Sequence, residues 1–293
     1  MKPAAFEYMA VESVDAALHA LADNAGDIRV LAGGQSLGPL LNLRIAVPGV
    51  LVDINRLDEL SHIDVTPDGS LSIGALTRQR RVETSARVAT SWRMLTEAIS
   101  HIGHRAIRNR GTIGGSIAHA DPAAELPAVL IALDATIQTA SVRGIRSIPA
   151  TEFFLGPFTT ALELDELLVG VTIPAVPSRT GQAWLEIARR HGDFGVIGVA
   201  AATEFDSEGT CVRARLVYSG ADWAPWQPET AASLLIGRAP TPTLFAEVGR
   251  VAAGESSPPA DIHASADHRR RLIEVLTARA LARCAGAAWK EPV

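Results

Sequence analysis

The sequence predicts an α+β protein of two main parts. In the first part, helix and strand patterns are mixed without regular alternation. In the second part, three long strand patterns follow one another and helical patterns close the chain. The segment Pro-Ala-Val-Pro at 174–177 separates the two parts, since proline interrupts both helices and sheets. Because regular strand–helix alternation is missing, a doubly wound Rossmann fold fits poorly.

The elements of the first part follow from apolar spacing and turn residues. Ser13 can cap a helix, because the apolar residues at 14, 17, 18 and 21 repeat at helical spacing. A long helical region is expected from Thr77 through about Ile99. Asp121 is predicted as the N-cap of a further helix and Pro122 as its first helical residue. Strands are expected at 28–31, 51–54, 71–73, 136–139, 141–148 and 167–173.

The second part reads as a strand meander followed by helices. The turn signal Asp206-Ser207-Glu208-Gly209 separates two of its strands. The run of arginines at 269–271 lies within the last helical pattern and is interpreted as a solvated face. Strands are expected at 184–188, 196–205 and 212–219, and helices at 229–235, 243–252 and 267–285.

Composition excludes several classes of partner. The 293-residue chain carries a net charge of −5, with 47% hydrophobic and 20% charged residues. No basic stripe is present, so nucleic acid is not expected as a partner. No apolar stretch is long enough to span a membrane, and the N-terminal residues lack the apolar core of a signal peptide. We therefore expect a cytoplasmic protein. The two isolated cysteines, Cys211 and Cys284, cannot hold an iron–sulfur cluster or a typical thiolate zinc site alone.

Two glycine-rich segments carry the strongest functional signal. The first, Ala32-Gly33-Gly34-Gln35-Ser36, follows a predicted strand; the second is Gly111-Thr112-Ile113-Gly114-Gly115-Ser116. Backbone without Cβ atoms can approach a phosphate closely and direct several N–H groups at it. Each segment alone could equally be a simple turn, and neither matches the P-loop pattern. Together they suggest two walls closing on one polyanion.

Other polar residues are less specific. Glu125, near a helix start, could accept a hydrogen bond from a ribityl-type hydroxyl or simply favour the helix N-terminus. The segment 189–194 could line a planar ligand or form a hairpin turn. The histidines at 101, 104 and 119 are expected to be surface or loop residues, since their spacing indicates no metal site. No nucleophile–base pattern is evident, so we expect neither a catalytic residue nor a metal ligand in this chain.

Several motifs occur in one order along the chain: the two glycine segments, Arg44, 120–125 (ADPAAE) and 190–194 (RHGDF). In this order they resemble the FAD-binding medium subunit of the molybdenum hydroxylases. This is the xanthine dehydrogenase and carbon monoxide dehydrogenase family, and the resemblance covers essentially the whole chain. It implies an FAD-binding domain of the PCMH (vanillyl-alcohol-oxidase-like) type over 1–176. That domain would comprise subdomains of about 1–57 and 58–176, with a C-terminal domain of a small antiparallel sheet and helices over 177–293.

The resemblance also implies a set of cofactor-binding residues. Glu125 falls where the family often has an aspartate near the cofactor's polyol chain, and Leu168 falls beside the isoalloxazine ring. Glu186 matches a position where several members carry lysine, so it would change the local charge. The implied FAD-binding residues are Ala32, Gly33, Gly34, Gln35, Ser36, Leu37, Gly111, Thr112, Ile113, Gly114, Gly115, Ser116, Glu125 and Leu168.

The expected function follows from the same resemblance. The chain would hold FAD and take electrons from the [2Fe–2S] clusters of a small subunit. It would pass them to an external acceptor, while a large subunit with a molybdenum–pterin cofactor oxidises the substrate. A dimer of heterotrimers is the expected assembly. Two alternatives stay open: a self-sufficient flavin oxidase of the same fold, and a scaffold that has lost its cofactor.

Overall fold

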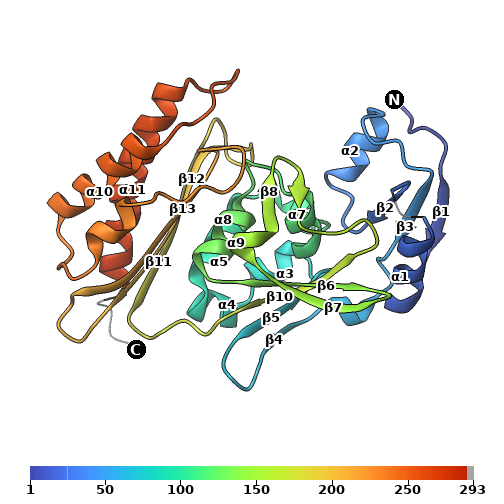
Figure 1. Cartoon of the computed structure of the whole chain (residues 1–293), viewed down its shortest axis with the longest axis horizontal. Helices are drawn as coiled ribbons and strands as arrows, with labels where there is room; N and C mark the ends of the chain where they lie inside the picture. Colours follow the sequence, from blue (N-terminus) through green and yellow to red (C-terminus); the bar gives the residue numbers. More distant parts are fainter. Residues whose placement is uncertain (25, 289–293) are drawn as a thin grey trace.

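The computed structural model describes residues 1–24 and 26–288, so the last five residues of the predicted second part lie outside the described residues. Apart from the two-stranded sheet of β8 and β9, the structure has three sheets. Figure 1 shows that they follow one another along the molecule in chain order, from the N-terminal lobe (blue) to the C-terminal helices (red). A separate hydrophobic cluster supports each sheet. The expected combination of mixed α+β regions and a small antiparallel sheet with helices is confirmed.

The first sheet is parallel and has the strand order β1-β3-β2. Its register places Leu31 opposite Asp53, so the chain leaves β2 and β3 at the same edge. The helix predicted after Ser13 is confirmed: the Ser13 hydroxyl accepts the Ala16 N–H at 3.1 Å. These elements are β1 (Glu7–Ala10), α1 (Val14–Asp23), β2 (Ile28–Leu31), α2 (Leu37–Asn42) and β3 (Val50–Asp53).

The second sheet is antiparallel, with the strand order β4-β5-β10-β6-β7. The predicted strands at 71–73, 136–139 and 167–173 lie at its centre. The strand predicted at 141–148 is shorter, because residues 142 and 143 turn the chain back between β6 and β7. The strands are β4 (Ile63–Val65), β5 (Leu71–Gly74), β6 (Thr136–Ser141), β7 (Gly144–Pro149) and β10 (Leu167–Ile173).

The helical region expected from Thr77 through about Ile99 is confirmed, and it is divided into three short helices. Ser85 stops the first helix by capping the second, with its hydroxyl accepting the Val88 N–H at 3.4 Å. Trp92 then breaks the second helix with a non-helical backbone. The helices are α3 (Gln79–Glu83), α4 (Ala86–Ser91) and α5 (Arg93–His101).

The predicted helix start at Asp121-Pro122 is wrong. Asp121 caps only a turn, its carboxylate accepting the Ala123 N–H at 2.9 Å. Helix α8 (Glu125–Ala132) begins at Glu125, and its leucines and valine are buried as expected. The preceding helix, α7 (Ile113–His119), ends at Ala120 in a left-handed conformation with φ 47°. The chain therefore reverses sharply between α7 and α8.

The third sheet is the predicted meander of three antiparallel strands. Helices α10 and α11 cover one face, and α5 and α8 of the central lobe pack on the other (Figure 1). Trp184 and Tyr218 are fully buried in this arrangement. The elements are β11 (Thr180–Ala188), β12 (Gly195–Phe205), β13 (Cys211–Ser219), the 3₁₀ helix η2 (Ala231–Leu235), α10 (Pro242–Glu255) and α11 (Ala266–Ala288).

Several short elements carry too few residues to show a period in the sequence. Besides β1 and β4, they are η1 (Asp58–Leu60), α6 (Arg105–Arg108), α9 (Ala150–Phe153), β8 (Phe154–Gly156) and β9 (Thr159–Thr160). No helix among the described residues is long and apolar enough to cross a membrane.

The interpretation of the arginine run as a solvated face is wrong for Arg269. This side chain is 5% exposed, and its guanidinium donates to the carbonyl oxygens of Val196 and Gly220. It also forms an ion pair with Asp261, with an N···O distance of 2.7 Å. Arg269 therefore ties the start of α11 to the ends of two strands and to the preceding loop.

We predict that Arg269→Met lowers the free energy of unfolding by about 2–3 kcal/mol, since hydrogen bonds to a charged group are lost and their carbonyl partners are left inside the protein. Arg271→Met is the matched control, because Arg271 is exposed on the same helix. Urea unfolding followed by tryptophan fluorescence measures both. Equal stability of the two variants would show that the Arg269 contacts are not needed.

Candidate functional site

The structure brings the two glycine-rich segments into direct contact. A Cβ built on Gly33 would overlap the carbonyl oxygen of Arg110 and lie 2.9 Å from the Cα of Gly111. A Cβ built on Gly115 would lie 3.9 Å from the Cβ of Ala32. The two segments therefore approach each other more closely than chains with side chains at these positions could.

The first segment offers unused hydrogen-bond donors. It connects β2 to α2, and Gly34 turns the chain with φ 71°. Among the described residues, no acceptor is found for the backbone N–H groups of 33–36. The Gln35 side chain instead donates to the Gly33 carbonyl at 3.0 Å, which fixes the turn from inside. A row of unused N–H groups before a helix is suited to an anion.

The second segment is not the loop that was expected, because residues 113–116 form the first turn of α7. Thr112 is the N-cap, and its hydroxyl accepts the Gly115 N–H at 3.0 Å. The N–H of Ile113 donates to Thr77, and that of Gly114 donates to Ala75. Because these donors already have partners in the protein, this segment forms a wall of the site and contributes few donors.

The glycines of the second segment are needed for packing. A Cβ on Gly114 would lie 2.6 Å from the Cβ of Ala75, and one on Gly111 would lie 2.5 Å from the Gln79 side-chain oxygen. That oxygen is buried and has no hydrogen-bond partner among the described residues. The glycines therefore seat the start of α7 against the chain that follows β5.

Glu125 lies with Glu186 in a second polar cluster. Glu125 is 6% exposed at the start of α8, and Glu186 on β11 accepts the Trp184 indole N–H at 3.2 Å. Burial, with a further contribution from the Glu186 charge, raises the pKa of Glu125 to about 8. Burial likewise raises the pKa of Glu186 to about 7, although the Trp184 hydrogen bond opposes it. The expected reversal of charge at position 186 is therefore only partial near neutral pH.

Leu168 is buried on β10 and lies in the central hydrophobic cluster. Neither Leu168 nor Glu125 is joined to a glycine segment by a hydrogen bond or ion pair among the described residues. Helix α7 provides the link, since it carries the second segment at its N-terminus and packs against both β10 and α8. Helix α7 thus contacts both of the elements that carry Leu168 and Glu125.

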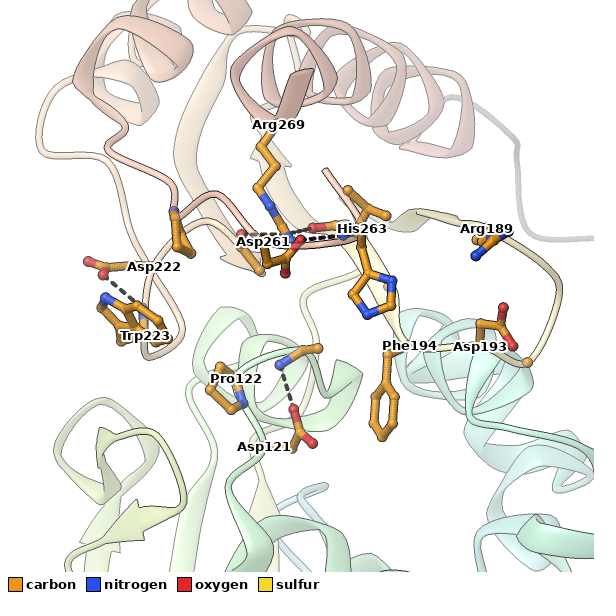
Figure 2. A pocket seen from close by; sticks show the side chains of 16 residues that line it. Asp121, Pro122, Arg189, Asp193, Phe194, Asp222, Trp223, Asp261, His263 and Arg269 are labelled. Carbon is orange, nitrogen blue, oxygen red and sulfur yellow. Dashed lines mark hydrogen bonds and ion pairs between the residues drawn. The ribbon is translucent and has the colours of Figure 1, made fainter. Parts of the chain in front are cut away.

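A cavity of about 590 Å³ opens beyond the α8 end of this region. Figure 2 shows Asp121 and Pro122 on one side and Asp261 and Arg269 on the other. The exposed ring of Phe194 also lines the cavity. The 189–194 segment is therefore both the β11–β12 connection and a cavity wall, which reconciles the two interpretations of its sequence.

The histidines at 101 and 119 pack against other rings, and His119 is the last residue of α7. His101 stacks on His191 with ring centroids 6.1 Å apart, and His119 packs against Phe158. Within the described residues, no group of three potential ligands could hold a metal ion.

Two residues at the glycine segments were missed by the sequence analysis. Asn55 donates to the carbonyl of Ala32 at 2.8 Å, and Arg78 donates to the carbonyl of Arg110 at 2.6 Å. Arg78 also donates to the Asn55 side-chain oxygen at 2.8 Å. The parallel ends of β2 and β3 could have indicated Asn55, because residues after neighbouring parallel strands lie side by side. No sequence pattern indicates Arg78.

Comparison with known proteins identifies the class. Residues 4–176 match the family profile described as FAD binding domain in molybdopterin dehydrogenase. Residues 182–284 match that of the CO dehydrogenase flavoprotein C-terminal domain. The chain therefore belongs to the FAD-binding medium subunits of the molybdopterin hydroxylases, the CO dehydrogenase and xanthine dehydrogenase family. It is a subunit of an oxidoreductase complex.

Individual relatives agree along nearly their whole length. The chain is 41% identical to the 6-hydroxypseudooxynicotine dehydrogenase complex subunit alpha of Paenarthrobacter nicotinovorans, covering 97% of this chain and 95% of that protein. It is 36% identical to the carbon monoxide dehydrogenase medium chain of Hydrogenophaga pseudoflava, covering 97% and 100%. The structure of quinoline 2-oxidoreductase from Pseudomonas putida 86 superposes with a TM-score of 0.93 at 38% identity, covering 99% and 100% of the two chains.

The residues of this chain fit an FAD. The unused N–H groups of 33–36 suit a pyrophosphate, and the tight contact at Gly33 keeps both walls of the site free of side chains there. The buried carboxyl of Glu125 suits a hydroxyl-rich chain, since a protonated carboxyl can both donate and accept hydrogen bonds.

We predict that Gly33→Ala lowers the FAD content of the purified protein by about tenfold or more, because the new methyl group forces the two segments apart. Gly38→Ala is the matched control: it lies in the adjoining helix, and a Cβ there meets nothing within 4 Å. Flavin absorbance per protein measures both variants. Full occupancy in Gly33→Ala would contradict the role given to this contact.

We predict that Glu125→Gln changes how stability depends on pH. The folded chain holds the Glu125 proton up to about pH 8, whereas the unfolded chain releases it near 4.5. Wild-type stability should therefore fall relative to the variant as pH rises between these values, by at most about 1.4 kcal/mol per pH unit. Thermal unfolding from pH 5 to 8 measures this. Glu152→Gln, an exposed change in α9, is the control, and parallel curves for wild type and Glu125→Gln would refute the prediction.

Proposed function

We propose that this chain holds one FAD between its two glycine-rich segments and transfers electrons within a molybdenum hydroxylase complex. The observation that carries the proposal is the row of unused N–H groups at 33–36, which includes Gly33, the residue at the close contact between the two segments. The match of residues 4–176 to the FAD-binding family supports it. In this proposal 32–37 bind the pyrophosphate and 111–116 form the opposite wall. Glu125 contacts the polyol chain, and Leu168 lies beside the flavin ring.

The chain's own residues bind the cofactor and set its surroundings. FAD, when bound, supplies an isoalloxazine ring that accepts and releases electrons. Buried side chains around Leu168 exclude water from this region. Raised pKa values keep the Glu125 carboxyl largely protonated and the Glu186 carboxyl about half protonated near pH 7. The pair therefore places less negative charge beside a reduced flavin than two ionised carboxylates would.

The same proposal assigns the other cofactors to partner subunits. A small subunit would carry the [2Fe–2S] clusters that supply electrons, and a large subunit would carry the molybdenum–pterin cofactor. An external acceptor would take the electrons, and the complex would be a dimer of heterotrimers. In support, burial raises the pKa of Cys211 to about 11 and that of Cys284 to about 12. Both sulfurs are therefore protonated at neutral pH and are unsuited to ligate a cluster.

We predict that expression with the neighbouring reading frames yields a complex with about one FAD per copy of this chain, released by acid because no covalent link is proposed. Flavin absorbance and iron and molybdenum analysis of the separated subunits measure the outcome. A complex that lacks flavin would refute the proposal. A free chain that oxidises a substrate by itself would favour the self-sufficient oxidase instead.

A further inference from the structure

Asn55 and Arg78 form a hydrogen-bonded bridge between the two glycine-rich segments. The bridge starts at the Ala32 carbonyl, which accepts the Asn55 side-chain N–H at 2.8 Å. It continues from the Asn55 oxygen to one guanidinium nitrogen of Arg78 at 2.8 Å. It ends where the other terminal nitrogen of Arg78 donates to the Arg110 carbonyl at 2.6 Å. Each segment is thus held through a backbone oxygen by one side chain of the pair.

The position of this bridge matches the point of closest approach. The Arg110 carbonyl that accepts from Arg78 is the same group that a Cβ on Gly33 would overlap. The Ala32 carbonyl belongs to the residue immediately before Gly33. The pair therefore spans the two walls beside Gly33, where the spacing between them is smallest.

The surrounding contacts hold both side chains in place. Asp53 accepts both the backbone N–H and the side-chain N–H of Asn55, at 2.8 and 2.7 Å. Asp53 is itself fixed by the Tyr8 hydroxyl at 2.6 Å. On the other side, the backbone N–H of Gln79 donates to the Gly111 carbonyl, which places Arg78 beside the second segment. Both residues are half-buried. The hydrogen bonds of Asn55 to the Ala32 carbonyl and to Arg78 are partly shielded from water, whereas that from Arg78 to the Arg110 carbonyl is exposed.

Only arginine suits this geometry. Its planar fork presents two donors at a fixed angle, and here one meets the Asn55 oxygen and the other meets the Arg110 carbonyl. Lysine has a single charged nitrogen on a flexible stem and lacks this fixed fork. The bridge therefore depends on the shape of the guanidinium as well as on its charge.

We propose that Asn55 and Arg78 are positioning residues that set the spacing between the two glycine-rich segments and thereby the affinity of the site for the FAD pyrophosphate. This inference rests on the proposed function. The pair acts through the backbone carbonyls of residues 32 and 110 and makes no contact with the cofactor itself. Loss of either residue opens the same bridge.

The test measures FAD and ADP binding to flavin-depleted complex by flavin fluorescence quenching and by competition. Arg78→Gln and Asn55→Ala should each raise the Kd for FAD about tenfold, and that for ADP by a similar factor, because ADP retains the pyrophosphate. Arg78→Lys should not restore affinity. The double variant should bind no more weakly than either single variant, since one break already opens the bridge.

The control is Arg81→Gln. Arg81 lies in the same helix but donates to the Ser61 carbonyl, away from both segments. Its Kd for FAD should match that of wild type. A thermal unfolding scan of each complex separates a loss of stability from a loss of affinity, since a purely structural role would lower the melting temperature without the shared change in both Kd values.

The outcomes are distinguishable. Wild-type affinity in Arg78→Gln would overturn the bridge while leaving the proposed function intact. Full rescue by Arg78→Lys would show that charge alone matters, and additive losses in the double variant would show two independent contacts; either result overturns the bridge. A wild-type complex that takes up no FAD would instead refute the proposed function on which the inference rests.

Discussion

The rest of the site depends on one steric constraint, the contact of Gly33 with the backbone at Arg110 and Gly111. A side chain at this point would separate the two segments and with them the first sheet from the start of α7. Glycine is usually explained at phosphate sites by close approach to the ligand. Here the glycines first allow two pieces of protein to approach each other, and the space for a ligand follows from that approach.

This constraint divides the work between the segments. In the second segment, the N–H groups of Ile113 and Gly114 donate to the carbonyls of Thr77 and Ala75, and that of Gly115 donates to the Thr112 hydroxyl. Buried donors with partners stabilise the fold, whereas unused donors are costly unless a ligand or water satisfies them. The first segment keeps its donors unused and its chain turned by Gly34. A wall whose donors are satisfied, beside a turn whose donors are unused, leaves the first segment to hold an anionic ligand.

The sequence predicted the parts of the fold that repeat over many residues. The meander from 180 to 219 and the capped helix after Ser13 show clear periods and boundaries. It did not predict where one residue overrides a period, as when Ser85 and Trp92 divide the expected helical region into three helices. At the site, the glycine pattern indicated both segments, but Asn55 and Arg78 meet only through the folded chain. The exposure predicted for Arg269 was wrong, because a run of arginines does not indicate which of them is buried.

Burial also changes the charge expected at Glu125 and Glu186. From sequence, Glu186 is expected to carry a negative charge. In the fold, burial raises the pKa of both carboxyls, and the Glu186 charge raises the pKa of Glu125 further. Glu186 lies on β11 of the third sheet, where it accepts the Trp184 indole N–H. A pair of this kind adjusts its charge to its surroundings, because an added negative charge nearby raises both pKa values further and draws in a proton. The carboxyl at position 186 is thus a site that can take up a proton when negative charge arrives.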